Sequence, residues 1–160
     1  MAAIRRAEAV WEGNLMSGRG ELTARSSGAF EGLPVTWASR SEESSGGKTS
    51  PEELLAAAHA SCFAMALSIE LTKLGASPKR LEVTADVTFD RTDGGYRVVS
   101  SVIDVLGDVD NIDPDRFAAA ADVARQGCPI SQALKGNVRV EVHPTLADGA
   151  AHDAEQHAPA

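Results

Sequence analysis

Two cysteines are the residues of this 160-residue chain best suited to chemistry. Cys62 lies in an apolar, alanine-rich run, and Cys128 follows Gly127, where a second helical run ends. A thiolate is a soft nucleophile, and its reactivity depends on how much of the thiol is deprotonated. A first thiolate can take oxygen from a peroxide and become a sulfenic acid, which a second thiol converts to a disulfide. Two cysteines at structured positions therefore suit the two-electron reduction of a peroxide.

Each cysteine also has a purely structural interpretation. A free cysteine packs well as a small hydrophobic side chain, and for Cys62 alone this interpretation is about as good as the chemical one. Cys128 favours chemistry because it precedes Pro129, a residue type that suits the first position of a helix. The positive end of a helix dipole lowers the pKa of a thiol placed there.

Charged residues could activate a thiolate at Cys62. Arg19 and Arg40 are the candidates for a guanidinium beside it, although most arginines are simply solvated. Glu52 could orient such an arginine, but it equally fits the role of an acid in a first helical turn. Ten residues of helix separate Glu52 from Cys62, about 15 Å along the axis, so Glu52 can serve the site only through another side chain or through chain packing. His59 could be a base or a thiolate partner, but a lone helical histidine more often only packs.

The composition limits the class of protein. With 43% hydrophobic and 24% charged residues, the chain suits one soluble globular domain. Its net charge of −8 argues against nonspecific nucleic-acid binding. Two cysteines are too few for a disulfide scaffold and lack metal-type Cys/His spacing, so we expect a reducing cytoplasm and no metal. We find no signal peptide and no run near the ~18 apolar residues of a membrane span, so we expect no membrane partner.

A long helix over residues 51–74 should position Cys62. Ser50 is a good N-cap, Pro51 suits the first helical position, and Glu53 completes the pattern of a capping box. The helix is apolar nearly all round, which predicts burial, and Gly75 should end it. The polar stretch 39–50 before it is interpreted as a flexible loop.

The other segments predict an α+β fold. The expected strands cover residues 4–13, 21–25, 81–91, 96–106 and 138–142, with hairpin turns at 18–20 and 93–95. A helix over 115–126 begins after Asp113, and a short helix covers 128–135. We expect a single domain over residues 1–146 and a disordered tail over residues 147–160.

Two segments resemble the OsmC/Ohr family of cysteine-based peroxidases. They are Thr49–Phe63, TSPEELLAAAHASCF, and Gly127–Ser131, GCPIS. Trp11-Glu12-Gly13 and the strand Thr84–Val87 are similar to the OsmC branch. The resemblance covers roughly residues 8–142. It implies an intertwined α+β homodimer in which two long central helices are wrapped by antiparallel sheets, with two cysteines and no prosthetic group.

The resemblance also implies roles for the site residues. Cys62 matches the peroxidatic cysteine, Cys128 the resolving cysteine, and Glu52 the acid that pairs with the catalytic arginine. Arg40, after the apolar strand, matches the arginine of the OsmC branch. Arg19, in a Gly-Arg turn, resembles that of the Ohr branch and is held in reserve.

The expected function is thiol-dependent reduction of organic hydroperoxides and hydrogen peroxide, in the manner of a peroxiredoxin. Cys62 forms the sulfenic acid, and Cys128 resolves it as an intramolecular disulfide. Peroxide is expected to enter a pocket at the dimer interface, lined by residues such as Leu54, Phe63 and Met65. A dithiol, with a lipoylated protein as one candidate, restores the thiols. The alternative is a redox-sensing or small-molecule-binding stress protein without turnover.

Overall fold

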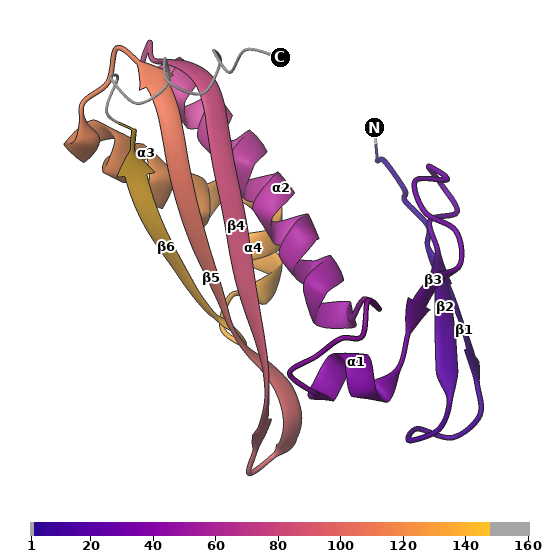
Figure 1. Ribbon diagram of the computed structural model, residues 1–160. Coiled ribbons are helices and arrows are strands. Elements are labelled where there is room, and N and C mark those ends of the chain that lie inside the picture. The colour runs from indigo at the N-terminus through magenta and orange to yellow at the C-terminus, as the bar shows by residue number, and fades with distance from the viewer. Residues whose placement is uncertain (1, 148–160) are drawn as a thin grey trace, which may run out of the picture. The chain divides into compact units, whose positions relative to one another are not determined.

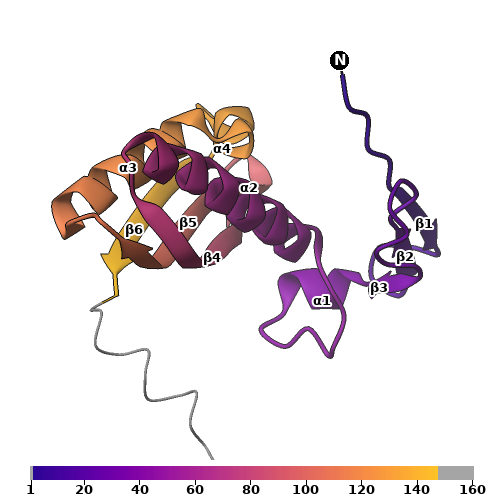
Figure 2. The same ribbon diagram turned by 90° about the horizontal axis from the view of Figure 1, so that it is seen from above.

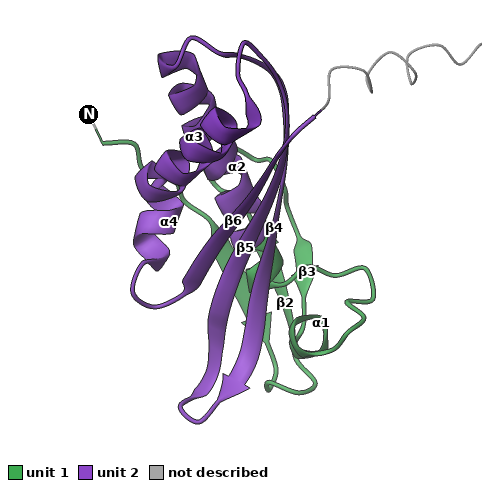
Figure 3. Cartoon of the chain, turned by 90° about the vertical axis from the view of Figure 1, so that its left-hand side faces the viewer, with its two compact units in different colours: residues 1–54 green, residues 55–160 purple. Residues whose placement is uncertain are grey.

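The computed structural model describes residues 2–147 (Figure 1). The chain divides into two compact units, residues 1–54 and 55–160, which are coloured separately in Figure 3. The single domain expected over residues 1–146 stays a prediction. Of the tail expected over 147–160, only Ala147 is described, and its amide donates to the Gly107 carbonyl at 2.8 Å; residues 148–160 lie outside the described part.

The first unit contains a three-stranded antiparallel sheet in the order β1 (Glu8–Glu12), β2 (Arg19–Thr23), β3 (Leu33–Val35). The predicted hairpin is confirmed, but the turn was placed too late, because Arg19 already pairs with Glu12. Gly20 is a strand residue for a packing reason. A Cβ at Gly20 would lie 2.8 Å from the Val35 side chain and 2.9 Å from the Trp11 ring.

A short helix, α1 (Trp37–Ser41), begins where a flexible loop was predicted. Thr36 and Ser39 form a capping box: the Ser39 amide donates to the Thr36 hydroxyl at 3.1 Å, and the Thr36 amide donates to the Ser39 hydroxyl at 3.0 Å. The Ser39 hydroxyl also donates to the Thr49 carbonyl at 2.9 Å. The polar side chains of this segment, which was interpreted as a flexible loop, therefore bond the free amides at the start of α1. Ser39 also joins α1 to Thr49, just before the next helix.

The long helix is confirmed as α2 (Pro51–Lys73). The Glu53 amide donates to the Ser50 hydroxyl at 3.1 Å, whereas the Glu53 carboxylate accepts from the Thr49 hydroxyl at 2.6 Å. Gly75, with a φ of +75°, follows the helix in the left-handed region that favours glycine.

Within a single chain the burial of α2 is one-sided, and burial all round the helix stays a prediction for the expected homodimer. A single stripe at four-residue spacing is fully buried, His59, Phe63, Leu67 and Leu71, whereas Met65 and Ile69 are exposed. By length and composition alone, α2 also passes as a membrane-spanning helix, contrary to the expectation from the sequence; the core helix of a soluble protein passes the same test.

The second unit is built on a three-stranded sheet in the order β4 (Ser77–Thr92), β5 (Gly95–Asp110), β6 (Arg139–Leu146). The helices α2, α3 (Pro114–Gly127) and α4 (Pro129–Leu134) lie on one face of it (Figure 2). Asp113 caps α3 as predicted by accepting from the Arg116 amide at 2.9 Å. The architecture is α+β.

The sheet of the second unit is mixed. β4 and β5 form the predicted antiparallel hairpin, but β6 pairs in parallel with β5, against the expectation of antiparallel pairing alone. The reason is the connection, because α3 and α4 cross over one face between β5 and β6, and a crossover returns the chain in the parallel direction. A core forms under these helices from Phe63, Leu67, Leu71, Ile103, Val105, Phe117, Ala121, Ala124 and Cys128.

Candidate thiol site

The two cysteines meet within the second unit. Cys62 is half-buried in the middle of α2, and Cys128 is fully buried between α3 and α4. Both are free thiols, and Cys62 packs against the buried core cluster that contains Cys128. The structure therefore brings together the two residues that were predicted to react in sequence.

The position of Cys128 is fixed by its backbone. Its amide donates to the Ala124 carbonyl at 2.8 Å and closes α3, whereas its carbonyl accepts from the Gln132 amide at 2.9 Å and opens α4. Cys128 itself is extended, with φ −64° and ψ 121°, and Pro129 follows at the first helical position. The break between two helices thus places the Cys128 side chain in the core beside α2.

The surroundings of Cys62 within this unit hold its thiol protonated. Burial is the main cause that raises the pKa of Cys62, and the hydrogen bond and charge of Cys128 raise it further. A backbone hydrogen bond from Ile130, the second residue of α4, acts in the opposite direction and lowers the pKa. The net shift is upward, so this unit alone does not favour a thiolate at Cys62.

An open cavity of about 440 Å³ lies beside Cys62. Its lining is mostly apolar and consists of Cys62, Met65, Ala66, Ile69, Glu70, Lys73, Ala124, Gly127 and Pro129. Met65 was expected there, but Phe63 was placed wrongly, because it is fully buried in the core. Leu54 is also absent from this lining.

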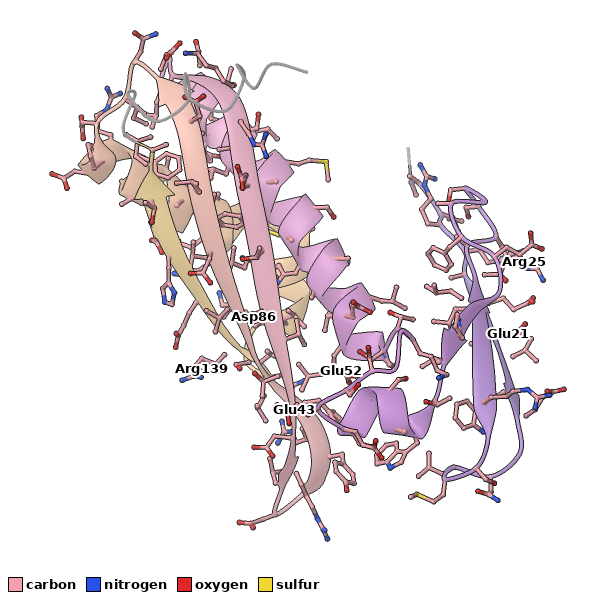
Figure 4. All side chains as sticks on the ribbon, viewed as in Figure 1. Glu21, Arg25, Glu43, Glu52, Asp86 and Arg139 are labelled. Carbon is pink, nitrogen blue, oxygen red and sulfur yellow. The ribbon has the colours of Figure 1, made fainter. Side chains whose placement is uncertain are left out.

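Arg40 and Glu52 form an ion pair within the first unit. The Arg40 Nη2 lies 2.8 Å from Glu52 Oε1, and Arg40 Nε donates to both carboxylate oxygens at 3.1 Å. Arg40 lies in α1 and Glu52 in the first turn of α2, so the capped helix α1 presents the guanidinium to the carboxylate. Figure 4 labels Glu52 at the start of α2. The Glu52 side chain is only 8% exposed and that of Arg40 33%.

Arg19 has a different partner. Its Nη2 lies 2.8 Å from Glu12 Oε2, and both side chains are largely exposed. Of the two candidate arginines, therefore, Arg40 is the one that the structure joins to Glu52.

His59 is a core residue, as its helical position favoured. Its Nδ1 lies 2.7 Å from the Ser101 hydroxyl and its Nε2 lies 2.8 Å from the Ser131 hydroxyl. Burial lowers the pKa of His59, so the imidazole is neutral near pH 7. The two serines were missed in the sequence, although Ser101 is in phase with Ile103 and Val105 in the inward row of β5.

The described part of the chain, residues 2–147, contains no group of three or more His, Cys, Asp or Glu side chains that could hold a metal ion. His143 lies 3.2 Å from Asp104 at the exposed surface of the sheet.

Two free cysteines in one packed core of an α+β fold define the site. The model of the OsmC-like protein family matches residues 44–143, and the chain belongs to the OsmC family.

Similar proteins and solved structures support the same family and fold. The chain is similar to Peroxiredoxin OsmC of Escherichia coli, with 36% identity over 88% of this chain and 96% of that protein. It is 32% identical to an organic hydroperoxide resistance protein-like 2 of Staphylococcus epidermidis over 62% of this chain and 70% of the relative. The fold matches OhrB of Bacillus subtilis with a TM-score of 0.67, at 23% identity over 88% of this chain and 98% of the other.

Proposed function

We propose that this protein is a cysteine-based peroxidase that reduces organic hydroperoxides and hydrogen peroxide. The observation that carries the proposal is the pair of free thiols, Cys62 and Cys128, in one packed core, with Cys62 at the edge of an open cavity. The names of the relatives, a peroxiredoxin and organic hydroperoxide resistance proteins, support the same activity.

The proposed reaction has three steps. The Cys62 thiolate attacks the outer oxygen of the peroxide; the O–O bond breaks, the leaving oxygen takes a proton and departs as an alcohol or water, and Cys62 becomes a sulfenic acid. The Cys128 sulfur then attacks the Cys62 sulfur, which forms a disulfide and releases water. A dithiol reduces the disulfide by exchange and returns both thiols.

In this proposal Cys128 resolves the sulfenic acid without a large movement, because both cysteines belong to the same packed core. The apolar cavity beside Cys62 suits the alkyl part of an organic hydroperoxide. Hydrogen peroxide has no alkyl part, so this apolar cavity would contribute less to its binding.

Arg40 is proposed as the group that holds Cys62 as a thiolate and stabilises the departing oxygen. A guanidinium is always charged and offers several fixed N–H donors to an oxyanion. Glu52 is proposed as a positioning residue, since its two oxygens take the Arg40 Nε and Nη2 donors and fix the plane of the guanidinium. Arg19 remains the alternative arginine.

The working form is proposed to be a cytoplasmic homodimer. Met65 and Ile69 on α2 are 64% and 56% exposed, which is unusual for large apolar side chains in one helix. A second copy of this chain would cover them and bring two sites near one interface. The reductant is proposed to be a dithiol, and a lipoylated protein is the candidate that the family resemblance names.

Peroxide consumption tests the proposal. Purified protein is mixed with cumene hydroperoxide or hydrogen peroxide, with dithiothreitol or dihydrolipoamide as reductant, and many turnovers per protein are expected. Cys62→Ser should abolish consumption. Cys128→Ser should still form a sulfenic acid that dimedone traps, but it should recycle poorly because the resolving thiol is missing.

The same assay can contradict the proposal. If Cys128→Ser is labelled by dimedone no better than Cys62→Ser, the division of roles is wrong. If the wild type consumes only one equivalent of peroxide with reductant in excess, it is not a peroxidase.

One observation favours a second function, a redox sensor that is oxidised once per stimulus. The pKa of Cys62 is raised by its surroundings within its own unit, which suits a slowly reacting thiol. Stoichiometric oxidation without turnover would support the sensor.

A further inference from the structure

The proposed mechanism leaves one fully buried ionisable residue without a role, His59. It heads the buried stripe of α2, where the three following positions of the stripe are Phe63, Leu67 and Leu71. A histidine in an apolar row is costly unless both ring nitrogens are satisfied. Both are, because Nδ1 lies 2.7 Å from Ser101 Oγ and Nε2 lies 2.8 Å from Ser131 Oγ. In a neutral imidazole one ring nitrogen donates and the other accepts, and either serine hydroxyl can complement either nitrogen.

The two serines belong to different parts of the unit. Ser101 lies in β5 and Ser131 in α4, and both are buried. His59 precedes Cys62 by three residues, and Ser131 follows Cys128 by three residues. The bond between His59 and Ser131 therefore joins the two helices that present the two thiols, whereas the bond between His59 and Ser101 only joins α2 to the sheet.

The helix α4 is short and weakly capped. It has only six residues, and Cys128 caps it without a side-chain hydrogen bond. Helices of this length are not stable by themselves in water, so tertiary contacts must hold α4. Yet α4 carries two groups that act on Cys62: the Ile130 backbone, which hydrogen-bonds the sulfur, and Cys128 at its start.

We propose that the His59–Ser131 hydrogen bond is a positioning contact that holds α4 against α2, so that the Ile130 backbone and the Cys128 thiol stay at the Cys62 sulfur. His59 and Ser131 touch neither sulfur in this role and act through α4. The part of the inference that concerns disulfide formation rests on the proposed function; the part that concerns the Cys62 thiol does not.

The contact affects two properties. With α4 in place, the Ile130 backbone, which lowers the pKa of Cys62, and Cys128, which raises it, both act on the sulfur, so loss of the contact should shift that pKa. In the resolving step, the Cys128 sulfur attacks the sulfenic sulfur of Cys62, the S–O bond breaks, and the oxygen leaves as water. A displaced α4 lengthens the path of that attack and should slow it.

The test compares Ser131→Ala with Ser101→Ala in the full chain. Each variant removes one hydroxyl partner from the same imidazole, but only Ser131 lies on the helix that carries Cys128. Two quantities are measured: the pH dependence of Cys62 alkylation by iodoacetamide, followed on the Cys62 peptide by mass spectrometry, and the rate of disulfide formation after one pulse of cumene hydroperoxide. Ser131→Ala should shift the pH dependence of Cys62 alkylation and slow disulfide formation about tenfold, the effect of one ordinary hydrogen bond.

Ser101→Ala should lower the melting temperature but leave the alkylation profile and the disulfide rate within about twofold of the wild type. Ser131→Thr, which keeps the hydroxyl, should restore both quantities. The inference is overturned if Ser131→Ala keeps the wild-type alkylation profile and rate, or if Ser101→Ala changes them as strongly. If the wild type does not turn over peroxide but Ser131→Ala still shifts the Cys62 profile, the positioning contact stands and the proposed peroxidase function fails.

Discussion

Arg40→Ala is the substitution that bears most directly on the site, because it removes one partner of a pair whose other member is buried. The Glu52 side chain is 8% exposed and accepts three bonds from Arg40, at 2.8, 3.1 and 3.1 Å. Removing one partner of a fully buried ion pair costs about 3–5 kcal/mol, because the remaining charge is left unpaired. The Arg40 side chain is 33% exposed, so water can replace part of the lost interaction. We therefore expect a loss of about 2 kcal/mol in the free energy of unfolding.

A double-mutant cycle in urea measures this pair. Glu52→Gln keeps the shape of the side chain and removes the charge, so it should cost less than Arg40→Ala. In the double variant the two losses should not add, and a coupling free energy of about 1 kcal/mol or more is expected for residues in direct contact. Arg19→Ala is the matched control, since Arg19 also pairs with a glutamate at 2.8 Å but is 75% exposed. It should leave the free energy of unfolding unchanged within error.

The same variants test the catalytic role. The second-order rate of Cys62 oxidation by cumene hydroperoxide should fall by orders of magnitude in Arg40→Ala, fall less in Glu52→Gln, and stay near wild type in Arg19→Ala. A coupling near zero would refute the structural reasoning on the Arg40–Glu52 pair. A fast Arg40→Ala with a slow Arg19→Ala would move the catalytic role to Arg19.

Three other predictions concern stability. Gly107→Ala should cost about 1–3 kcal/mol in urea unfolding, because a Cβ there would lie 2.5 Å from the buried Phe117 ring, whereas Gly127→Ala, with nothing within 4 Å, should not destabilise. Phe63→Ala should cost about 3–5 kcal/mol in the same assay, since Phe63 is fully buried in the core. Burial lowers the pKa of His59 below that of a histidine in the unfolded chain, about 6.5. Below that pH the unfolded state binds more protons than the folded state, so the free energy of unfolding should fall as the pH drops. His59→Gln should flatten that part of the melting-temperature profile.

The elements with strong local signals were predictable from the sequence. The N-terminus of α2 is encoded by Ser50, Pro51 and Glu53, and its end by Gly75. The β4–β5 hairpin follows from the alternation of apolar residues on both sides of Asp93-Gly94. In each case neighbouring residues determine the conformation, so a pattern in the sequence is enough.

The features that depend on distant residues were not predictable. From the sequence alone Ser39 is typical of a loop, but in the structure it bonds Thr36 at the start of α1 and the carbonyl of Thr49. The polar residue Ser101 interrupts an apolar row of its strand, and its role is clear only from its bond to His59, which lies 42 positions away in the sequence. The sequence motifs suggested which cysteine reacts first. Only the break between α3 and α4 shows how Cys128 is placed in the core against α2.

The proposed reaction needs a source of positive charge, because burial raises the pKa of Cys62 within its own unit. A peroxidatic cysteine reacts as its thiolate, yet burial and the neighbouring Cys128 favour the thiol, and the Ile130 backbone offsets only part of that effect. The lining of the cavity beside Cys62 includes one cation, Lys73, and its Nζ lies 2.8 Å from Glu70 Oε1, so much of its charge is neutralised. A strong positive charge for the thiolate must therefore come from beyond this group of residues. Arg40 is the proposed source, since its guanidinium carries a permanent charge and Glu52 fixes its plane. The packing of the two cysteines in one core favours the second step, in which Cys128 forms the disulfide. The Arg40 variants test whether a guanidinium supports the first step, the attack of Cys62 on the peroxide.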